Sequence, residues 1–192
     1  MTRIAVITGS TRPGRQALDV AQWVLGIASE REDASFELVD IAEFELPLLD
    51  EEAPAMMGDY RHDHTKAWAA KIAPFDGFVF VTPEYNHSTS AALKNAIDYL
   101  YAEWNNKAAG FVSYGVGPGG TRAVEHLRLV MGELKVADVR SQLALSFAED
   151  FEEMSKFNPR EHQAEQLTTV LDDLIGWAEA LRGLRESEDT EK

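Results

Sequence analysis

Residues 3–16 read RIAVITGSTRPGRQ, a short apolar run rich in β-branched residues that passes directly into a polar loop containing Gly9 and Gly14. Such a run is typical of a strand that is buried on both faces of a parallel sheet. Apolar residues then recur with helical spacing from Gln16 to about Arg31. The chain therefore opens with a predicted strand, glycine loop and helix.

The same rhythm repeats along the rest of the chain. The predicted strands cover residues 3–8, 36–40, 77–82, 108–114 and a stretch within 136–145. The predicted helices cover residues 16–31, roughly 65–73, a stretch that begins near Ser88, about 121–134 and 159–181. Because crossovers between parallel strands are right-handed, this alternation predicts a three-layer α/β sandwich with a five-stranded parallel sheet.

Length and composition predict one domain. The 192 residues, 45% of them hydrophobic, suffice for one well-buried core and are too few for two. We expect a single domain over residues 1–185 and a disordered acidic tail over 186–192. No window approaches the roughly 18 apolar residues of a membrane span, and no leader precedes the first strand. These features predict a soluble, cytoplasmic protein without a membrane partner.

Two further features restrict the chemistry. The chain has no cysteine, which excludes disulfides, thiolate metal sites and cysteine nucleophiles, so a redox function would need a bound cofactor. Its formal net charge of −15 at pH 7 repels nucleic acid phosphates, so nucleic acid is not expected as a partner. No metal site is expected either. The sequence suggests no third ligand for His62 and His64, and no cysteine or second histidine lies at ligand spacing from His87.

The first loop, GSTRPGRQ at residues 9–16, has the chemistry of a phosphate site. Small hydroxyl side chains and flexible backbone offer N–H donors at a helix N-terminus, and Arg12 or Arg15 can add a charged fork. The lysine of a Walker A loop is missing. The simpler alternative is that Ser10 or Thr11 caps the helix and the arginines are solvated.

The second loop, TPEYNHSTS at residues 82–90, leads into an amphipathic helix. Pro83 ends the strand pairing, and Ser88 with Thr89 can cap the helix. An exposed Tyr85 could lie flat against an aromatic ligand, or it could pack against neighbouring loops.

The third loop, SYGVGPGGTR at residues 113–122, has enough glycines for close contact with a flat ring. It also matches the dinucleotide pattern GxGxxG, but that pattern belongs in the first strand–helix unit, so we discount the match. The first, third and fourth strands send their loops to the switch point of a sheet ordered 2-1-3-4-5, where flavodoxin-like folds bind FMN.

Three segments carry a resemblance to a known family: GSTRPGR near the N-terminus, PEYNHSTSAALKNAIDY after the third strand, and GFVSYG in the fourth. Over roughly residues 3–135 the chain resembles the NADPH-dependent FMN reductases, a flavodoxin-like family of flavin, quinone, azo dye and chromate reductases. The resemblance implies bound FMN, with NADPH or NADH as co-substrate.

The resemblance also implies which residues hold the flavin. The phosphate would be held by Ser10, Arg12 and Gln16, with Thr11 contributing backbone. The isoalloxazine would be lined, largely through main-chain N–H groups, by Pro83, Glu84, Tyr85 and Asn86, with Ser113 and Gly115 on its other side. Ser90 and Ala91 stand where family members often have proline and glycine, and we expect this to change only helix capping.

By this resemblance the chain is an enzyme that passes hydride from NAD(P)H through FMN to a small acceptor in a ping-pong cycle. The acceptor would be a quinone, a flavin, an azo compound or a metal oxyanion. No catalytic side chain is required, because flavin N5 carries the chemistry. The alternatives are a flavodoxin-type electron carrier and a cofactor-free binding module.

Two features of the sequence have more than one interpretation. The segment that follows the third helix contains three aromatic residues, Tyr99, Tyr101 and Trp104, which is unusual for a surface element. These rings predict a homodimer or homotetramer, unless they complete the core under the fourth helix. The long connection at residues 41–64 is a flap, a partner contact or an ordinary surface excursion.

Overall fold

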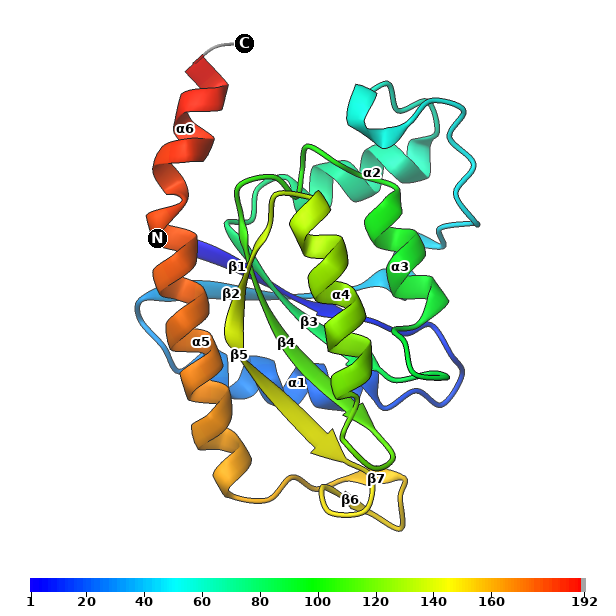
Figure 1. The fold of residues 1–192 in the computed structure, drawn as a ribbon, viewed down its shortest axis with the longest axis vertical. Coiled ribbons are helices and arrows are strands. Elements are labelled where there is room, and N and C mark those ends of the chain that lie inside the picture. Colours follow the sequence, from blue (N-terminus) through cyan, green and yellow to red (C-terminus); the bar gives the residue numbers. More distant parts are fainter. Residues whose placement is uncertain (191–192) are drawn as a thin grey trace.

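The computed structural model describes residues 1–190, without the side chains of 188–190. Its five-stranded sheet is parallel and has the order β2-β1-β3-β4-β5, as predicted (Figure 1). The strands are β1 (Thr2–Thr8), β2 (Ala34–Asp40), β3 (Gly77–Pro83), β4 (Ala108–Gly115) and β5 (Ala137–Ser146).

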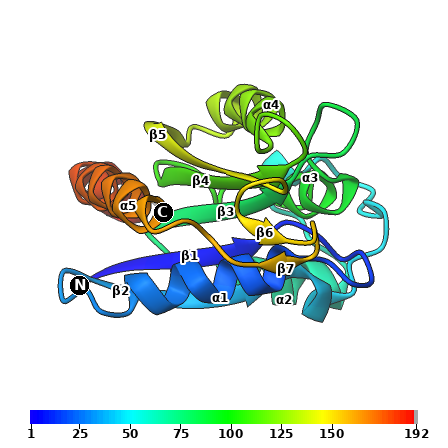
Figure 2. The same ribbon diagram turned by 90° about the horizontal axis from the view of Figure 1, so that it is seen from below.

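Six α-helices and two 3₁₀ turns surround the sheet in the described part of the chain. They are α1 (Ala17–Ala28), η1 (Ile41–Phe44), η2 (Ala55–Met57), α2 (Asp63–Ile72), α3 (Ala91–Asp98), α4 (Thr121–Glu133), α5 (His162–Ala180) and α6 (Arg182–Thr190). Figure 2 shows α3 and α4 on one side of the twisted sheet and α1 on the other. The predicted three-layer flavodoxin-like sandwich is confirmed.

The core divides into two clusters because successive strand side chains point to opposite faces. From β1, Ile4 and Val6 pack with α1 and α5, whereas Ala5 and Ile7 pack with α2, α3 and α4. The second cluster is rich in aromatic rings, and Trp104 meets the ring of Phe78 edge-on at 4.9 Å.

The third helix begins later than predicted. Ser90, and not Ser88 or Thr89, is the N-cap of α3, and its hydroxyl oxygen accepts the Leu93 N–H at 3.0 Å. Ser88 is unavailable because its backbone pairs with that of Tyr85 in a tight turn. The predicted capping by Ser88 and Thr89 is therefore wrong, and the expected difference in capping from other family members stays a prediction.

The sequence did not predict a small hairpin between β5 and α5, formed by β6 (Phe151–Glu152) and β7 (Lys156–Phe157). Its base is held by Asp150, which is buried and accepts hydrogen bonds from the side chains of Arg160 and Gln163. The strands have two residues each, too few for a pattern in the sequence.

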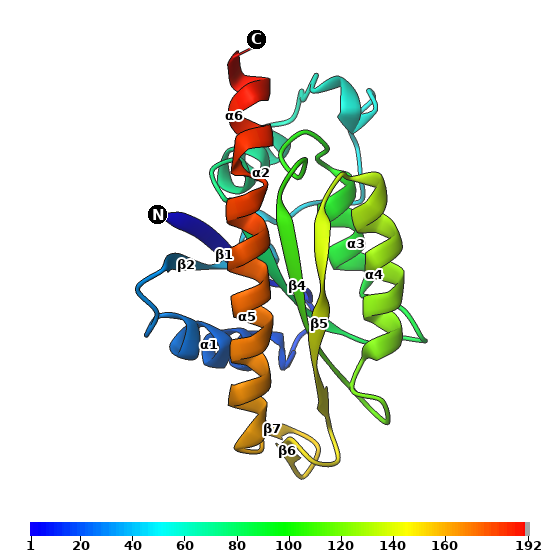
Figure 3. The same ribbon diagram turned by 60° about the vertical axis from the view of Figure 1, so that its left-hand side comes forward.

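The end of the chain differs from the predicted disordered tail. Helix α6 continues the line of α5 as far as Thr190 (Figure 3), and residues 191–192 lie outside the described part. Arg185 anchors α6, because its guanidinium pairs with Asp76 at 2.6 Å and donates to the Asn106 carbonyl. Within residues 1–190, no helix combines the length and apolar content needed to cross a bilayer.

The aromatic residues after α3 do not form a surface patch. Tyr99 and Trp104 are 0% and 1% exposed, and both belong to the core cluster that includes α4. The prediction that these rings form a subunit interface is therefore wrong, and the alternative, that they complete the core, is confirmed. These rings can be buried because their polar groups donate hydrogen bonds to backbone carbonyls. The Trp104 indole N–H, for example, donates to the Ile97 carbonyl at 3.0 Å.

Lys107, just before β4, is a buried cation at the amino edge of the sheet. Its ammonium donates to the carbonyls of Ile72 and Ala73 at 3.2 and 2.8 Å, which closes the C-terminus of α2. Burial, and secondarily the charge of Arg185, lowers the pKa of Lys107 to about 8. The folded protein therefore releases this proton before the unfolded chain does.

We expect the free energy of unfolding to rise with pH from about 8, the folded pKa of Lys107, to about 9.5, which is still below its ordinary pKa of 10.5. Nearer pH 10 the tyrosines whose pKa is raised on folding, such as Tyr99, begin to act in the opposite direction. Between about pH 8 and about 9.5 the unfolded chain binds more protons, so the gain is on the order of 2 kcal/mol. Urea unfolding across this range should show the rise in the wild type and in Lys156→Met, an exposed control, but not in Lys107→Met. An equal rise in Lys107→Met would contradict the assignment.

Candidate functional site

Three loops meet at the carboxyl edge of the sheet: residues 9–16 after β1, 84–90 after β3 and 116–120 after β4. The first two are joined where Gly9 N–H donates to the Val81 carbonyl at 2.7 Å and where the hydroxyls of Ser10 and Tyr85 lie 3.2 Å apart. The second loop is joined to the end of β4, just before the third loop, by the Glu84 N–H, which donates to the Tyr114 carbonyl at 3.1 Å. The predicted convergence is therefore present.

The first loop leaves the N-terminus of α1 free of a side-chain cap. The N-cap is Gln16, whose side chain makes no capping bond, so neither Ser10 nor Thr11 caps this helix. A helix N-terminus without a cap presents N–H groups and partial positive charge to a ligand.

The two arginines of the first loop have different surroundings. Arg15 forms an ion pair with Asp40 at the end of β2, and Thr8 donates to the same carboxylate at 2.7 Å. Arg12 is exposed and is absent from the ion pairs among the described residues. Arg12 is thus the arginine that is free to bind an anion.

Two buried polar atoms in this loop have no hydrogen-bond partner in the described structure, the Arg15 Nε and the Gln16 Oε1. Leaving a buried donor or acceptor unpaired costs about 1–3 kcal/mol. The unpaired N–H fits an anionic oxygen, and the unpaired Gln16 oxygen fits a hydroxyl. The loop therefore has the donor and acceptor set that a phosphorylated polyol needs.

Tyr114 is a site residue that sequence reasoning missed. It lies at the end of β4 and is 3% exposed, yet its phenol is close to the loop after β1, where it hydrogen-bonds the backbone of Ala17. Burial and the neighbouring Tyr85 raise its pKa, against the opposing effect of Arg15 and Arg12. It stays protonated and able to donate. The only signal in the sequence was its place at the end of a buried strand.

The second loop turns back at Asn86 and His87. Both have positive φ, 49° and 70°, and the backbones of Tyr85 and Ser88 bond each other in both directions. This is the pattern of a type I′ turn, which favours asparagine at its first central position. The Glu84 N–H donates to the Tyr114 carbonyl and the Tyr85 N–H donates to the Ser88 carbonyl. The N–H of Asn86, an exposed residue, does not take part in these backbone hydrogen bonds.

The Glu84 side chain holds the second loop to α4. Its carboxylate is 6% exposed, pairs with the Arg122 guanidinium and accepts the Arg122 N–H at 3.2 Å. The same arginine contacts His87 Nε2 at 2.8 Å, and His126 Nδ1 lies 2.9 Å from the Ser88 hydroxyl. Glu84 is thereby a positioning residue for the loop that carries Tyr85.

The third loop is packed tightly at its base. Ser113 is fully buried, and its hydroxyl donates to the Gly119 carbonyl at 2.8 Å. A Cβ added at Gly115 would lie 3.3 Å from Gly120 N, and one at Gly120 only 2.9 Å from the Ser113 Cβ. Packing thus accounts for Gly115 and Gly120 of the discounted GxGxxG match, and a positive φ of 71° accounts for Gly117. Ser113 and Gly115 support the loop from beneath, and their contact with a ligand remains a prediction.

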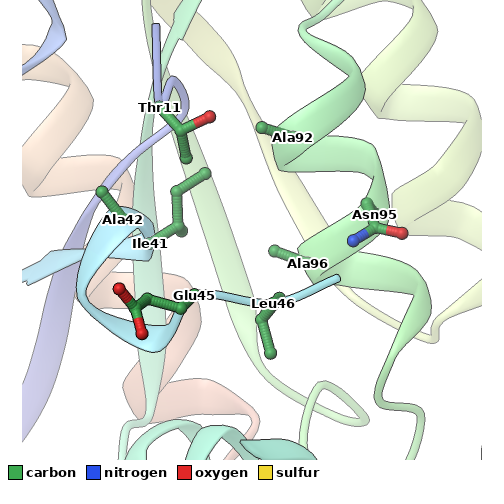
Figure 4. A pocket seen from close by; sticks show the side chains of 8 residues that line it. All are labelled: Thr11, Ile41, Ala42, Glu45, Leu46, Ala92, Asn95 and Ala96. Carbon is green, nitrogen blue, oxygen red and sulfur yellow. The ribbon is translucent and has the colours of Figure 1, made fainter. Parts of the chain in front are cut away.

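A pocket of about 380 Å³ opens beside the first loop. Figure 4 shows Ala92 and Ala96 pointing from α3 toward Ile41 and Leu46, with Thr11 at the border. Of the predicted site residues only Thr11 lines this pocket. The contribution of η1 and the connection after it was not visible in the sequence, because that stretch has little regular pattern.

Comparison with known proteins is consistent with this geometry. The family model for NADPH-dependent FMN reductase matches residues 2–150. An NAD(P)H-dependent FMN reductase of Schizosaccharomyces pombe is 43% identical over 150 residues, 77% of this chain and 74% of that protein. A 2-hydroxy-1,4-benzoquinone reductase of a Burkholderia species is 34% identical over 143 residues, 70% of this chain and 72% of that protein.

Among solved structures, the flavoenzyme NAD(P)H:(acceptor) oxidoreductase of Paracoccus denitrificans superposes with a TM-score of 0.71. The match covers 94% of this chain and 98% of that one at 23% sequence identity. At that identity the likeness supports the fold.

Removal of Arg122 tests the link between the second loop and α4. Arg122→Ala leaves the buried Glu84 carboxylate without its cation, so we expect the free energy of unfolding to fall by roughly 1–3 kcal/mol, less than for a fully buried pair because Arg122 is partly exposed. Glu84→Gln keeps the shape and should cost less. Urea unfolding measures both, with the exposed Arg140→Ala as control. Equal stability of Arg122→Ala and Arg140→Ala would contradict this role of Glu84.

Proposed function

The chain belongs to the NADPH-dependent FMN reductase family, and we propose that it reduces a small acceptor at the expense of NAD(P)H in a ping-pong cycle. It is an oxidoreductase of a family that uses FMN and NAD(P)H. The observation that supports the proposal best is the uncapped N-terminus of α1 beside an unpaired arginine and an unpaired buried N–H.

We assign the FMN phosphate to the first loop. The N–H groups at the start of α1, the free Arg12 and the hydroxyl of Ser10 supply its donors, with the Thr11 backbone beside them. Arg15 is held by Asp40 and contributes its Nε. The Gln16 oxygen is an acceptor, which suits a ribityl hydroxyl better than the phosphate.

We assign the isoalloxazine to the second and third loops. Tyr85 is half-buried and offers a ring surface, Asn86 offers a free main-chain N–H, and Pro83 bounds the loop at the end of β3. Glu84 contributes through the ion pair that fixes the loop. When bound, FMN supplies hydride acceptance at N5, so no side chain is required as acid or base. The protein's part is to orient the reactants and exclude water.

A quinone is the acceptor class that the relatives favour. The relatives include FMN reductases and quinone reductases, and the tip of the third loop is exposed to solvent. One surface would serve both substrates in turn, so NAD(P)⁺ leaves before the quinone binds. Homodimer or homotetramer formation and a cytoplasmic location remain predictions. Exposed Leu48, Met56 and Met57, at 82%, 66% and 70%, are the apolar side chains that favour an interface.

Substitution of Arg12 tests the phosphate assignment. Arg12→Ala removes one charge-assisted contact, worth about 1.5–3 kcal/mol, so the Kd for FMN should rise roughly tenfold to more than a hundredfold. Flavin fluorescence titration of the apoprotein measures it. The stability of the apoprotein should not change, because Arg12 is exposed. Arg140→Ala is the matched control, and an unchanged Kd in Arg12→Ala would contradict the assignment.

Rapid mixing tests the reaction. Anaerobic NADPH added to the FMN-loaded protein should bleach the flavin absorbance in the absence of an acceptor, and a quinone added afterwards should restore it. Steady-state rates at several quinone concentrations should give parallel double-reciprocal lines. A flavin that stays oxidised, or lines that intersect, would contradict hydride acceptance or the ping-pong order respectively.

A further inference from the structure

Two histidines and an aspartate meet outside the three loops. His62 is the N-cap of α2, His64 lies in the first turn of that helix, and Asp50 belongs to the connection that precedes it. From the sequence, the two histidines lacked a third ligand. The structure supplies one, because the connection at residues 41–64 folds back onto the start of α2.

The ligand atoms converge without any ion. His64 Nε2 lies 3.0 Å from Asp50 Oδ1, and His62 Nε2 lies 3.2 Å from the Asp50 carbonyl oxygen. One ligand atom from each of the three residues lies within 4.8 Å of the other two. Neighbouring ligands of a tetrahedral zinc ion are about 3.3 Å apart, since the bonds are about 2.0–2.2 Å long. Small side-chain movements would close that difference.

The three side chains are held in this orientation by their neighbours. The rings of His62 and His64 stack at 5.2 Å with 6° between their planes, and the Tyr99 ring meets His64 edge-on at 5.7 Å. The Tyr99 hydroxyl donates to Asp50 Oδ1 at 2.9 Å. This hydrogen bond orients the carboxylate whose Oδ1 also contacts His64.

The local charge also favours a cation. A helix N-terminus alone would oppose one, but Glu51 accepts the N–H groups of Arg61 and His62 at 2.9 and 3.0 Å and so places a second carboxylate beside Asp50. The net charge of the chain is −15.

We propose that Asp50, His62 and His64 form a binding site for one divalent transition-metal cation, with zinc as the representative ion and water completing its coordination. Two imidazoles with one carboxylate suit zinc, nickel or copper, whereas magnesium and calcium prefer oxygen ligands alone. The site is distinct from the flavin loops and does not depend on the proposed reaction.

A cation at this point would join three parts of the fold. It would tie the connection at Asp50 to α2 directly and to α3 through Tyr99. The residues just before Asp50 are already bonded to α3, because the Asn95 side chain donates to the Pro47 carbonyl at 2.7 Å and accepts the Leu49 N–H at 2.9 Å. Since Asn95 lines the pocket beside the first loop, the cation would steady one wall of that pocket.

Calorimetric titration with zinc chloride tests the site. The protein is used as the tag-free, FMN-loaded chain of 192 residues after dialysis against a chelator. We expect saturable binding of one zinc per chain, weakened at least tenfold in His62→Gln and in His64→Gln. The exposed His162→Gln is the matched control and should bind as the wild type does. No saturable binding to the wild type, or equal affinity in all variants, would overturn the proposal.

A second readout separates loss of the site from loss of the fold. Zinc should raise the Tm of the wild type and of His162→Gln, because it binds the folded state, and should leave that of Asp50→Asn unchanged. Asp50→Asn keeps an oxygen that accepts from Tyr99, so the fold around it is preserved. A zinc-dependent Tm in Asp50→Asn equal to that of the wild type would also overturn the proposal.

Discussion

The structure depends on the close approach of Gly9 to β3. A Cβ at this position would lie 2.6 Å from the Val81 carbonyl oxygen and 2.9 Å from Leu93, so only glycine fits. The Gly9 N–H donates to Val81, and its carbonyl accepts the Ser90 hydroxyl that also caps α3. One residue thereby joins the end of β1, the end of β3 and the start of α3. The first and second loops both take their positions from this contact.

The strand order and the three converging loops could be predicted because buried parallel strands leave a strong pattern, β-branched runs stopped by glycine or proline. The ends of elements were less predictable where competing polar residues stood together. Ser88, Thr89 and Ser90 can each cap a helix, and the choice follows from the turn made by Tyr85 and Ser88. Helix α6 extends into the acidic tail, and Arg185, just before the tail, supplies an anchor that the composition did not reveal.

For the candidate site, the sequence predicted which loops converge but not which of their side chains are paired and which are free. Which arginine is free depends on Asp40, which lies 25 residues beyond Arg15 and is brought to it by the pairing of β1 and β2. Tyr114 was missed because a tyrosine in an apolar strand looks like a core residue. Asp50 was missed as a partner of His62 and His64 because the connection between them has no periodicity. In each case, the deciding contact joins residues distant in the sequence.

The third loop divides into a rigid base and an open tip. Gly119 and Gly120 are pressed against β5 and β4, whereas Val116 is 67% exposed and nothing lies within 4 Å of a Cβ placed at Gly117. Side chains at the tip can therefore diversify during evolution without disturbing the sheet beneath, as long as the turn geometry at Gly117 is respected. The base of this loop therefore tolerates little change, whereas its tip tolerates side chains of different size and polarity.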